Sequence, residues 1–402
     1  MLLVGPDPGC AVATIATDLP VEPGVVTVVS LLTNARDWRW LAEAVAASAP
    51  KGVAVRLAVS NAGAPQEGDG QSTARLLAER LRADVIAPDG QVLLIPGGSA
   101  FVVAPSGQGT QPTGESGRWV RFSPDGTVVP LGARFPEPPW AQAAARLMGD
   151  RGGGVTVVEV PAGLWASTGG NGSAPRLDDL AFCVPLDAEL CTLIVGSAAG
   201  TRPDPEAVVS ALVDLPPAAR DRLLVAPYGS GARSAGVVAG ELARRWDRPV
   251  YLSNGIPAIG SDGVRRTLVT EDDGSPLWWP ASSRVRCGPE GPPVPVEPTP
   301  LLADVPSVAD RVWALREPWL VEQTHFGLWI RHLDAPASVE QVAQIPWDPR
   351  WLTVVAGVPG QPSDGVRPVL AGLLGRFPEQ VKARTRVVSP ELLSRLAGPI
   401  RR

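Results

Sequence analysis

A repeated phrase constrains this chain more than any other feature: a short β-branched run, then a helix, then a second apolar run. Three copies of the first run read Val26–Val29, Cys191–Ile194 and Leu352–Val355. The second run recurs after an apolar-periodic segment, as Val55–Ser60, Arg222–Pro227 and Thr385–Pro390. Self-similarity of this kind indicates a repeat architecture. Alternating strands and helices of these lengths predict βαβ units around a mainly parallel sheet.

The repeats predict a tandem α/β protein whose third unit is truncated, because it stops before a third strand. We place repeat one at residues 1–132, a proline-rich joint and connecting segment at 133–154, and repeat two at 155–291. A proline-rich linker at 292–300 and a partial repeat at 301–402 follow. The proline-rich stretches Arg134–Trp140 and Gly288–Pro300 are predicted to be extended, semi-rigid spacers.

Local signals place further elements within the repeats. Ser72 is expected to begin the second helix of repeat one, and Ser234–Trp246 is the matching helix of repeat two. Asp204–Leu212 is a further predicted helix, and Leu180–Pro185 is predicted as a strand. Three apolar segments after repeat one's third strand predict a β-meander; they are Val92–Ile95, Phe101–Val103 and Trp119–Phe122.

Composition excludes several classes of protein. The 402 residues are 45% hydrophobic, and the 43 glycines and 44 prolines fall between the apolar runs, so they punctuate a folded chain. A net charge of −5 with interspersed signs argues against a nucleic-acid surface, which shows a clustered basic stripe. No apolar run has the ~20 residues of a membrane span.

The N-terminus and the cysteines bear on the compartment and on metal binding. No signal peptide is visible after Met1, so we expect a cytoplasmic protein and leave export as part of a larger assembly open. The cysteines lack metal-ligand spacing, and Cys183 and Cys191 are predicted to be small buried hydrophobes. No metal and no cofactor is expected.

The order of strands, the helix begun by serine and the short strand ending in Ala87-Pro88 resemble a known family. The chain is similar to the caspase-like (caspase–hemoglobinase fold) cysteine peptidase domains of large bacterial polymorphic-toxin proteins. The resemblance spans most of repeats one and two and about half of repeat three. It implies a catalytic His at the end of the first strand and a catalytic Cys at the end of the second.

No repeat keeps either catalytic residue. The family's His position falls on Leu31, Gly196 and Gly357 of the three repeats, and its Cys position falls on Ser60, Pro227 and Pro390. A thiolate is the nucleophile of this chemistry and an imidazole activates it. We therefore expect the peptidase activity to be absent, although an enzyme of another kind is left open.

Two weaker candidate sites also have structural explanations. The only histidines, His325 and His332, are expected to be half-exposed strand or loop residues. The turn between Tyr228 and Gly236 could cradle an anion, with its candidate residues being Gly229, Ser230, Gly231 and Ser234. A glycine-rich turn at the top of a parallel sheet is the alternative.

The chain has thirteen tryptophans, and several of them lie at unit boundaries, where they either fill cores or anchor protein contacts. The interface candidates are Trp38, Trp40, Trp278 and Trp279. The sequence thus favours a non-catalytic scaffold or interaction module, a homo-oligomer or one docked on a larger toxin-like or conflict-system protein. The alternatives are a hydrolase using Ser60 or Ser230 and a small-molecule or anion binder. The sequence leaves the partner, the oligomeric state and the cellular role open.

Overall fold

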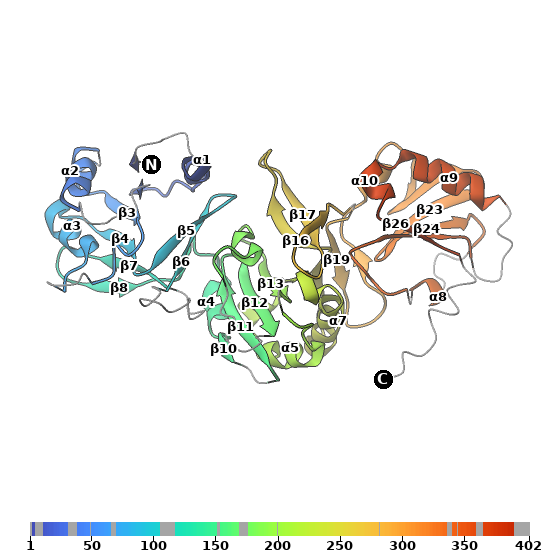
Figure 1. The fold of residues 1–402 in the computed structure, drawn as a ribbon, viewed down its shortest axis with the longest axis horizontal. Helices are drawn as coiled ribbons and strands as arrows, with labels where there is room; N and C mark the ends of the chain where they lie inside the picture. The colour runs from blue at the N-terminus through green and yellow to red at the C-terminus, as the bar shows by residue number, and fades with distance from the viewer. Residues whose placement is uncertain are drawn as a thin grey trace. The chain divides into compact units, whose positions relative to one another are not determined.

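The computed structural model is an α/β protein with several mixed sheets, which contain both parallel and antiparallel strands (Figure 1). It describes residues 2–4, 11–30, 38–48, 50–65, 70–104, 117–150, 153–168, 176–198, 200–280, 282–335, 340–343, 345–358 and 365–389. The chain forms two compact units. One comprises residues 1–193, 214–222 and 258–264, and the other comprises 194–213, 223–257 and 265–402.

The first sheet has the strand order β1-β2-β3-β4-β7-β8. Its first four strands are parallel, and the last two are added antiparallel. The strands are β1 (Leu2–Val4), β2 (Val25–Ser30), β3 (Ala54–Ala58), β4 (Val85–Pro88), β7 (Trp119–Phe122) and β8 (Val128–Pro130). Helices α1 (Ala11–Thr17), α2 (Trp38–Ser48) and α3 (Thr73–Leu81) accompany it, and Ser72 caps α3 by accepting from the Arg75 amide, as predicted. A side sheet is made of β5 (Gln91–Ile95), β6 (Ser99–Val103) and β9 (Arg134–Phe135).

Both faces of this sheet are covered, which explains why β2 is a continuous β-branched run rather than an alternating one. Val28 and Leu57 pack on one face with Leu77 of α3. Val29 packs on the other face with residues from the side sheet. The meander prediction is wrong for Trp119–Phe122, because β7 pairs antiparallel with β4 in the main sheet.

The second sheet has the order β10-β11-β12-β13-β14-β15-β19-β20. The strands are β10 (Gly149–Asp150), β11 (Val155–Val160), β12 (Gly163–Thr168), β13 (Cys191–Val195), β14 (Leu223–Pro227), β15 (Val250–Ser253), β19 (Arg284–Cys287) and β20 (Val294–Pro295). Helices α4 (Ala141–Ala145), α5 (Pro205–Leu212), α6 (Pro217–Arg220) and α7 (Ser234–Trp246) go with it, and α7 has the predicted bounds. The side sheet holds β16 (Ile256–Ile259), β17 (Arg265–Thr270) and β18 (Pro276–Trp278). Leu180–Cys183 is a 3₁₀ helix, not a strand.

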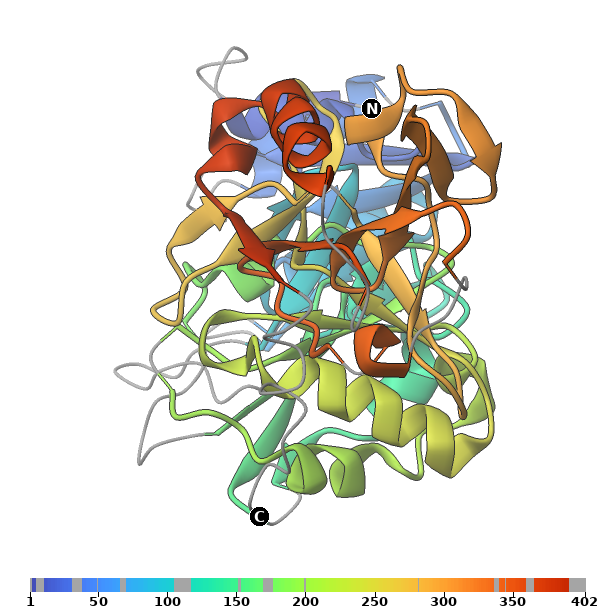
Figure 2. The ribbon, with the colours of Figure 1, turned by 90° about the vertical axis from the view of Figure 1, so that its right-hand side faces the viewer.

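The third sheet has the order β21-β22-β23-β24-β25-β26. The strands are β21 (Ser307–Ala309), β22 (Val312–Arg316), β23 (Trp319–Thr324), β24 (Gly327–His332), β25 (Leu352–Ala356) and β26 (Thr385–Val388). Helices α9 (Val366–Arg376) and α10 (Glu379–Lys382) cover one face, and the short α8 (Glu340–Ala343) lies on the other (Figures 1 and 2). A 3₁₀ helix at Pro300–Leu302 precedes this sheet.

The sheets share strand directions and backbone contacts. The parallel run β24-β25-β26 has the directions of β1-β2-β3, and β14-β15-β19 has those of β3-β4-β7. Gly163 and Gly327 each begin a strand at positive φ, where a Cβ would lie 2.3 Å from the carbonyl oxygen of Thr192 or Thr353 respectively. Only glycine permits that backbone approach.

The proline-rich stretches are not spacers, which corrects the prediction. Arg134 and Phe135 form β9 and pair with β6, and both side chains are buried. Val294–Pro295 pairs antiparallel with β19 as an edge strand. Proline is tolerated in edge strands because its missing N–H need not face a neighbour. Gln323, which is buried, also fixes this stretch by accepting from the Thr299 amide and donating to the Glu297 carbonyl.

Candidate functional site

The carboxyl end of β13 is where a parallel sheet of this kind would place a catalytic side chain. Gly196 stands there at a φ of +97°, and a Cβ added to it would lie 2.2 Å from the Gly231 nitrogen and 2.3 Å from the Tyr228 oxygen. The Tyr228 amide donates to the Val195 carbonyl at 2.9 Å. The turn after β14 therefore closes this sheet edge with backbone atoms, and no side chain fits at Gly196.

Of the other five positions that the resemblance assigns, Ser60, Pro227 and Gly357 lie within the described residues. Pro227 is buried at the end of β14. The Ser60 hydroxyl accepts a hydrogen bond from the Val92 amide at 3.1 Å. Gly357, at a φ of +103°, donates to the Ile330 carbonyl and accepts from the Trp329 indole at 2.9 Å. Leu31 and Pro390 lie outside the described residues.

The predicted anion-binding turn is held together by its own hydrogen bonds. The Gly229 amide donates to the Thr270 hydroxyl, and the Ser230 amide donates to the Ser197 carbonyl. The Gly231 amide donates to the Tyr228 carbonyl at 2.9 Å. The Ser234 hydroxyl donates to the Pro203 carbonyl at 2.8 Å. These amides and this hydroxyl are bonded to other groups of the chain. The glycines are therefore explained by the close approach of the turn to the end of β13.

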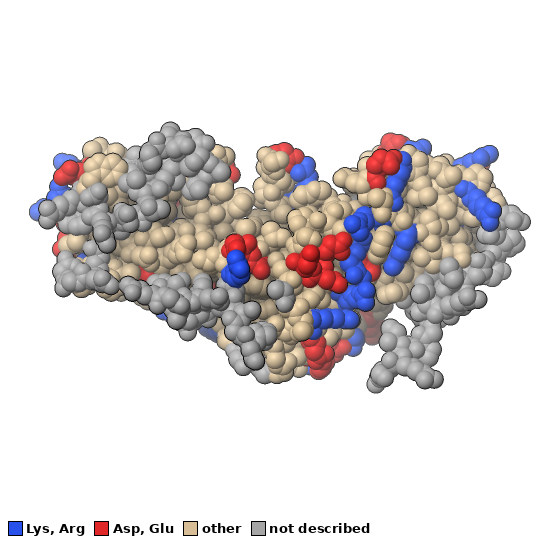
Figure 3. Space-filling view, in the orientation of Figure 1, with Lys and Arg blue, Asp and Glu red and all other residues tan. Residues whose placement is uncertain are grey.

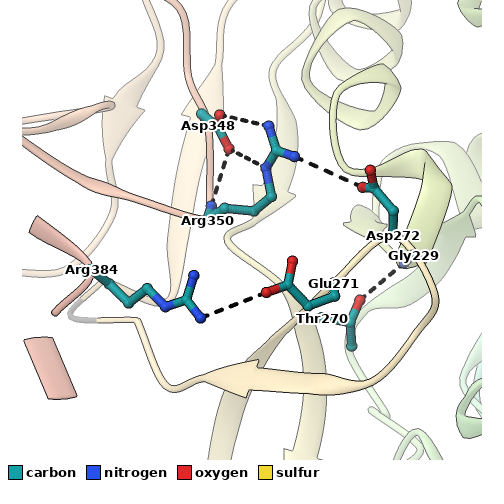
Figure 4. A network of polar contacts seen from close by, with 7 residues as sticks. All are labelled: Gly229, Thr270, Glu271, Asp272, Asp348, Arg350 and Arg384. Carbon is teal, nitrogen blue, oxygen red and sulfur yellow. Dashed lines mark hydrogen bonds and ion pairs between the residues drawn. The ribbon is translucent and has the colours of Figure 1, made fainter. Parts of the chain in front are cut away.

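Beyond this turn, a charged cluster links the β17–β18 hairpin with the segments before β25 and β26 (Figure 4). We call it the hairpin clamp, and it comprises Glu271, Asp272, Asp348, Arg350 and Arg384. Arg350 binds the Asp348 carboxylate through two nitrogens, each at 3.0 Å, and lies 3.9 Å from Asp272. Arg384 lies 3.6 Å from Glu271.

The clamp is partly shielded from water. Burial alone would raise the pKa of Asp348, but the hydrogen bonds and charge of Arg350 outweigh it, so the pKa of this carboxyl is lowered. The same hydrogen bonding raises the pKa of Arg350. Figure 3 shows acidic and basic side chains side by side in this region, between β19 and β26 of Figure 1. The paired charges favour a structural joint over an acid–base catalyst, which needs a group free to exchange its proton.

Tryptophans reinforce the same junction. The Trp347 indole donates to the Asn254 side chain at 2.8 Å, and the Trp278 indole donates to the Pro349 carbonyl at 3.2 Å. Trp278 is buried, so the prediction of an exposed contact residue is wrong there. Trp279 is half-buried. Trp40 is 49% exposed and remains an interface candidate. The Trp38 side chain lies outside the described residues.

The histidines lie at the third sheet. His325 is buried, which corrects the expectation of a half-exposed residue, and its Nε2 is 2.8 Å from the Ile345 carbonyl oxygen. Burial lowers its pKa, despite that hydrogen bond, so the ring is neutral at pH 7 with the proton on Nε2. His332 is half-exposed and packs edge-on against Trp319.

We expect acidification to destabilise the third sheet through His325. The unfolded chain binds a proton at about pH 6.5, whereas folded His325 resists protonation. The free energy of unfolding should therefore fall as pH drops below that value, by at most about 1.4 kcal/mol per pH unit for one group. Denaturant unfolding at pH 7.5 and 5.5 measures this fall. His325→Gln should reduce this fall, and equal pH dependence in the parent and in His325→Gln would contradict the assignment.

The remaining candidates are the cysteines and possible metal ligands. Cys191 is buried as predicted, and burial raises its pKa to about 12. Cys183 is exposed, which the prediction missed because its segment is a 3₁₀ helix. Among the described residues, no group of His, Cys, Asp and Glu side chains could hold a metal ion. Nor does any helix in the described part have the length and apolarity to cross a membrane.

Comparisons with protein-family models, curated proteins and solved structures found no match to this chain.

The sequence did not single out the hairpin clamp. Glu271 and Asp272 are neighbours in the sequence, but their partners Arg384 and Arg350 lie far along the chain. The pairing depends on how the β17–β18 hairpin meets the third sheet, which no local pattern in the sequence indicates.

Proposed function

We propose that this chain is a non-catalytic scaffold or protein-interaction module, built from degenerate repeats of a caspase-like peptidase fold. The observation that carries the proposal is the closure of the β13–β14 edge. Ligand and catalytic sites of parallel α/β sheets lie outside the carboxyl ends of the strands. Here the Tyr228–Gly231 turn occupies that place, and Gly196 has no room even for a methyl group.

The contacts of the two candidate serines support the same reading. The Ser60 hydroxyl accepts from a backbone amide, and the Ser230 hydroxyl donates to the Thr201 carbonyl at 3.3 Å. Nucleophilic serine requires a base within hydrogen-bond reach. The chain's two histidines belong to the third sheet, where His325 is bonded to a carbonyl. In the described structure, the contacts of these serines and of the Gly229–Gly231 turn therefore favour neither the hydrolase nor the anion binder.

The scaffold role includes association with protein, either with further copies or with a larger toxin-like or conflict-system protein. A homo-oligomer in the cytoplasm is part of the proposal. The hairpin clamp and the buried Trp278 favour a structural role, because they join the β17–β18 hairpin to the segment before β25 through paired charges and an indole hydrogen bond. Trp40 is an exposed aromatic of the kind enriched at protein interfaces.

The absence of catalysis can be tested with electrophilic probes. We expect no covalent labelling by fluorophosphonate or by acyloxymethyl ketone probes, because Ser60 and Ser230 are hydrogen-bonded to backbone groups and not to a base. Labelling is read by intact-protein mass spectrometry. Ser60→Ala and Ser230→Ala are the matched variants. The non-catalytic assignment would be overturned if the parent protein were labelled stoichiometrically and either variant lost that labelling. Self-association is measured separately, by light scattering over a concentration series.

A further inference from the structure

A recess lies where the strands β24 and β25 begin, and aromatic rings form much of its lining. Its cavity volume is about 40 Å³, and it is open to solvent. The described residues that line it all belong to the unit of residues 194–213, 223–257 and 265–402. Those that matter for binding are Trp278, His325, Phe326, Trp347, Asp348 and Trp351.

The charge of the lining favours a cation over an anion. Asp348 is the only Asp, Glu, Lys or Arg among the described residues that line the recess. His325 adds no positive charge at pH 7, because burial lowers its pKa. Arg350 binds the Asp348 carboxylate (Figure 4) but is not among those lining residues. The carboxylate therefore attracts a cation less than a free one would, and the aromatic rings have to supply the rest.

Several polar groups of the lining are bonded within the protein, and one is not. The Trp278 indole donates to the Pro349 carbonyl, and the Trp347 indole donates to the Asn254 side chain. The Asn254 amide in turn donates to the Ser282 carbonyl at 2.7 Å. The Ser282 hydroxyl oxygen also borders the recess; it is buried and has no hydrogen-bond partner among the described residues. An unpaired buried hydroxyl costs stability, and an N–H donor bound in the recess would satisfy it.

The volume of the recess limits the size of the group that fits. One water molecule needs about 10–15 Å³ of such space, so the recess has room for about three non-hydrogen atoms. A dimethylammonium group, with two methyl carbons and one nitrogen, has this size. Its methyl groups share the positive charge and are attracted to aromatic rings, and its N–H is a hydrogen-bond donor.

We propose that this recess binds a small alkylammonium group with the size and chemistry of dimethylammonium. The rings of Trp278, Trp347 and Trp351 attract its methyl groups, and its N–H donates to the Ser282 hydroxyl. The group belongs either to a free amine or to a methylated lysine side chain, because both present the same cation. This inference goes beyond the proposed function and does not depend on it.

Dimethylammonium chloride is the first probe. A ligand of three non-hydrogen atoms has a dissociation constant of about 1 mM at best, so the titration covers the millimolar range. Saturation-transfer NMR of the methyl protons measures binding to the full chain. We expect saturable binding of dimethylammonium and about tenfold weaker binding of 2-propanol, a neutral molecule of similar size. N-acetyl-dimethyllysine amide separates the two sources: tighter binding than that of the free ion assigns the recess to a protein side chain, and weaker binding assigns it to a free amine.

Tryptophan variants locate the site. Trp351→Leu removes one ring of the recess but keeps an apolar side chain, so it should weaken dimethylammonium binding about tenfold. Trp351→Phe keeps a ring and should retain most of the binding. Trp246→Leu is the matched control, because Trp246 is half-buried like Trp351 but is not among the residues that line the recess. Unfolding curves of the three variants check that each still folds.

Three results would overturn the inference. The first is the lack of saturable binding to the full chain; binding that appears only after residues 390–402 are removed counts as the same result, because the chain itself would then fill the recess. The second is equal binding of 2-propanol and dimethylammonium, and the third is equal weakening by Trp351→Leu and Trp246→Leu. None of these measurements involves covalent labelling, so this inference and the non-catalytic assignment fail separately.

Discussion

Glu159→Gln is expected to lower the free energy of unfolding by about 3–5 kcal/mol, the cost of leaving one member of a buried ion pair alone. Glu159 and Arg134 are ion-paired with side chains 4% and 2% exposed. Arg134 also donates to the carbonyls of Pro161, Val160 and Gly163, at 2.9, 2.6 and 2.9 Å. The amide retains the shape of the carboxylate but leaves the guanidinium charge uncompensated.

An exposed pair provides the control for this substitution. Glu189 is ion-paired with Arg222, but its side chain is 78% exposed. Glu189→Gln should therefore cost no more than about 1 kcal/mol, as surface ion pairs do. Urea unfolding monitored by tryptophan fluorescence compares the two variants. If Glu159→Gln proved as mild as Glu189→Gln, the buried pair would not hold β9 to the β11–β12 hairpin.

This pair also shows where sequence reasoning fell short. Arg134 begins a proline-rich stretch, and such stretches indicate exposed spacers. Its burial depends on three carbonyls at the turn between β11 and β12, 26 to 29 residues further along. Hydrogen bonds to backbone carbonyls leave no pattern in the sequence. The same limit hid the burial of His325, whose partner is the Ile345 carbonyl.

Elements governed by local chemistry were predictable. The helix cap at Ser72 and the bounds of α7 are confirmed, because capping residues and apolar periodicity act over a single turn of helix. The β-branched runs at β2, β13 and β25 are strands, because each is covered on both faces. The α/β class follows from them. The caspase-like identity of the repeats stays a prediction.

Gly196→Ala is expected to destabilise the protein by roughly 2–5 kcal/mol, and the reason bears directly on function. An alanine at this φ of +97° costs about 1–2 kcal/mol through backbone strain alone. Its methyl group would also lie 2.2 Å from the Gly231 nitrogen, and such overpacking adds about 1–3 kcal/mol. Gly263→Ala is the matched control, because Gly263 has a φ of +75° but nothing within 4 Å of its Cβ position.

Urea unfolding gives the free energy of unfolding of each variant. The difference between the two variants separates the cost of the methyl contact with the turn from the cost of backbone strain. If both substitutions lower the free energy of unfolding equally, the turn is not in close contact with the end of β13. The argument for a closed edge then fails. If Gly196→Ala is clearly the worse of the two, the closure is built from backbone and not from a replaceable side chain. A histidine could then not be introduced at Gly196 by substitution alone, because the Tyr228–Gly231 turn would first have to move away. That would tie the proposed lack of catalysis in this repeat to its fold.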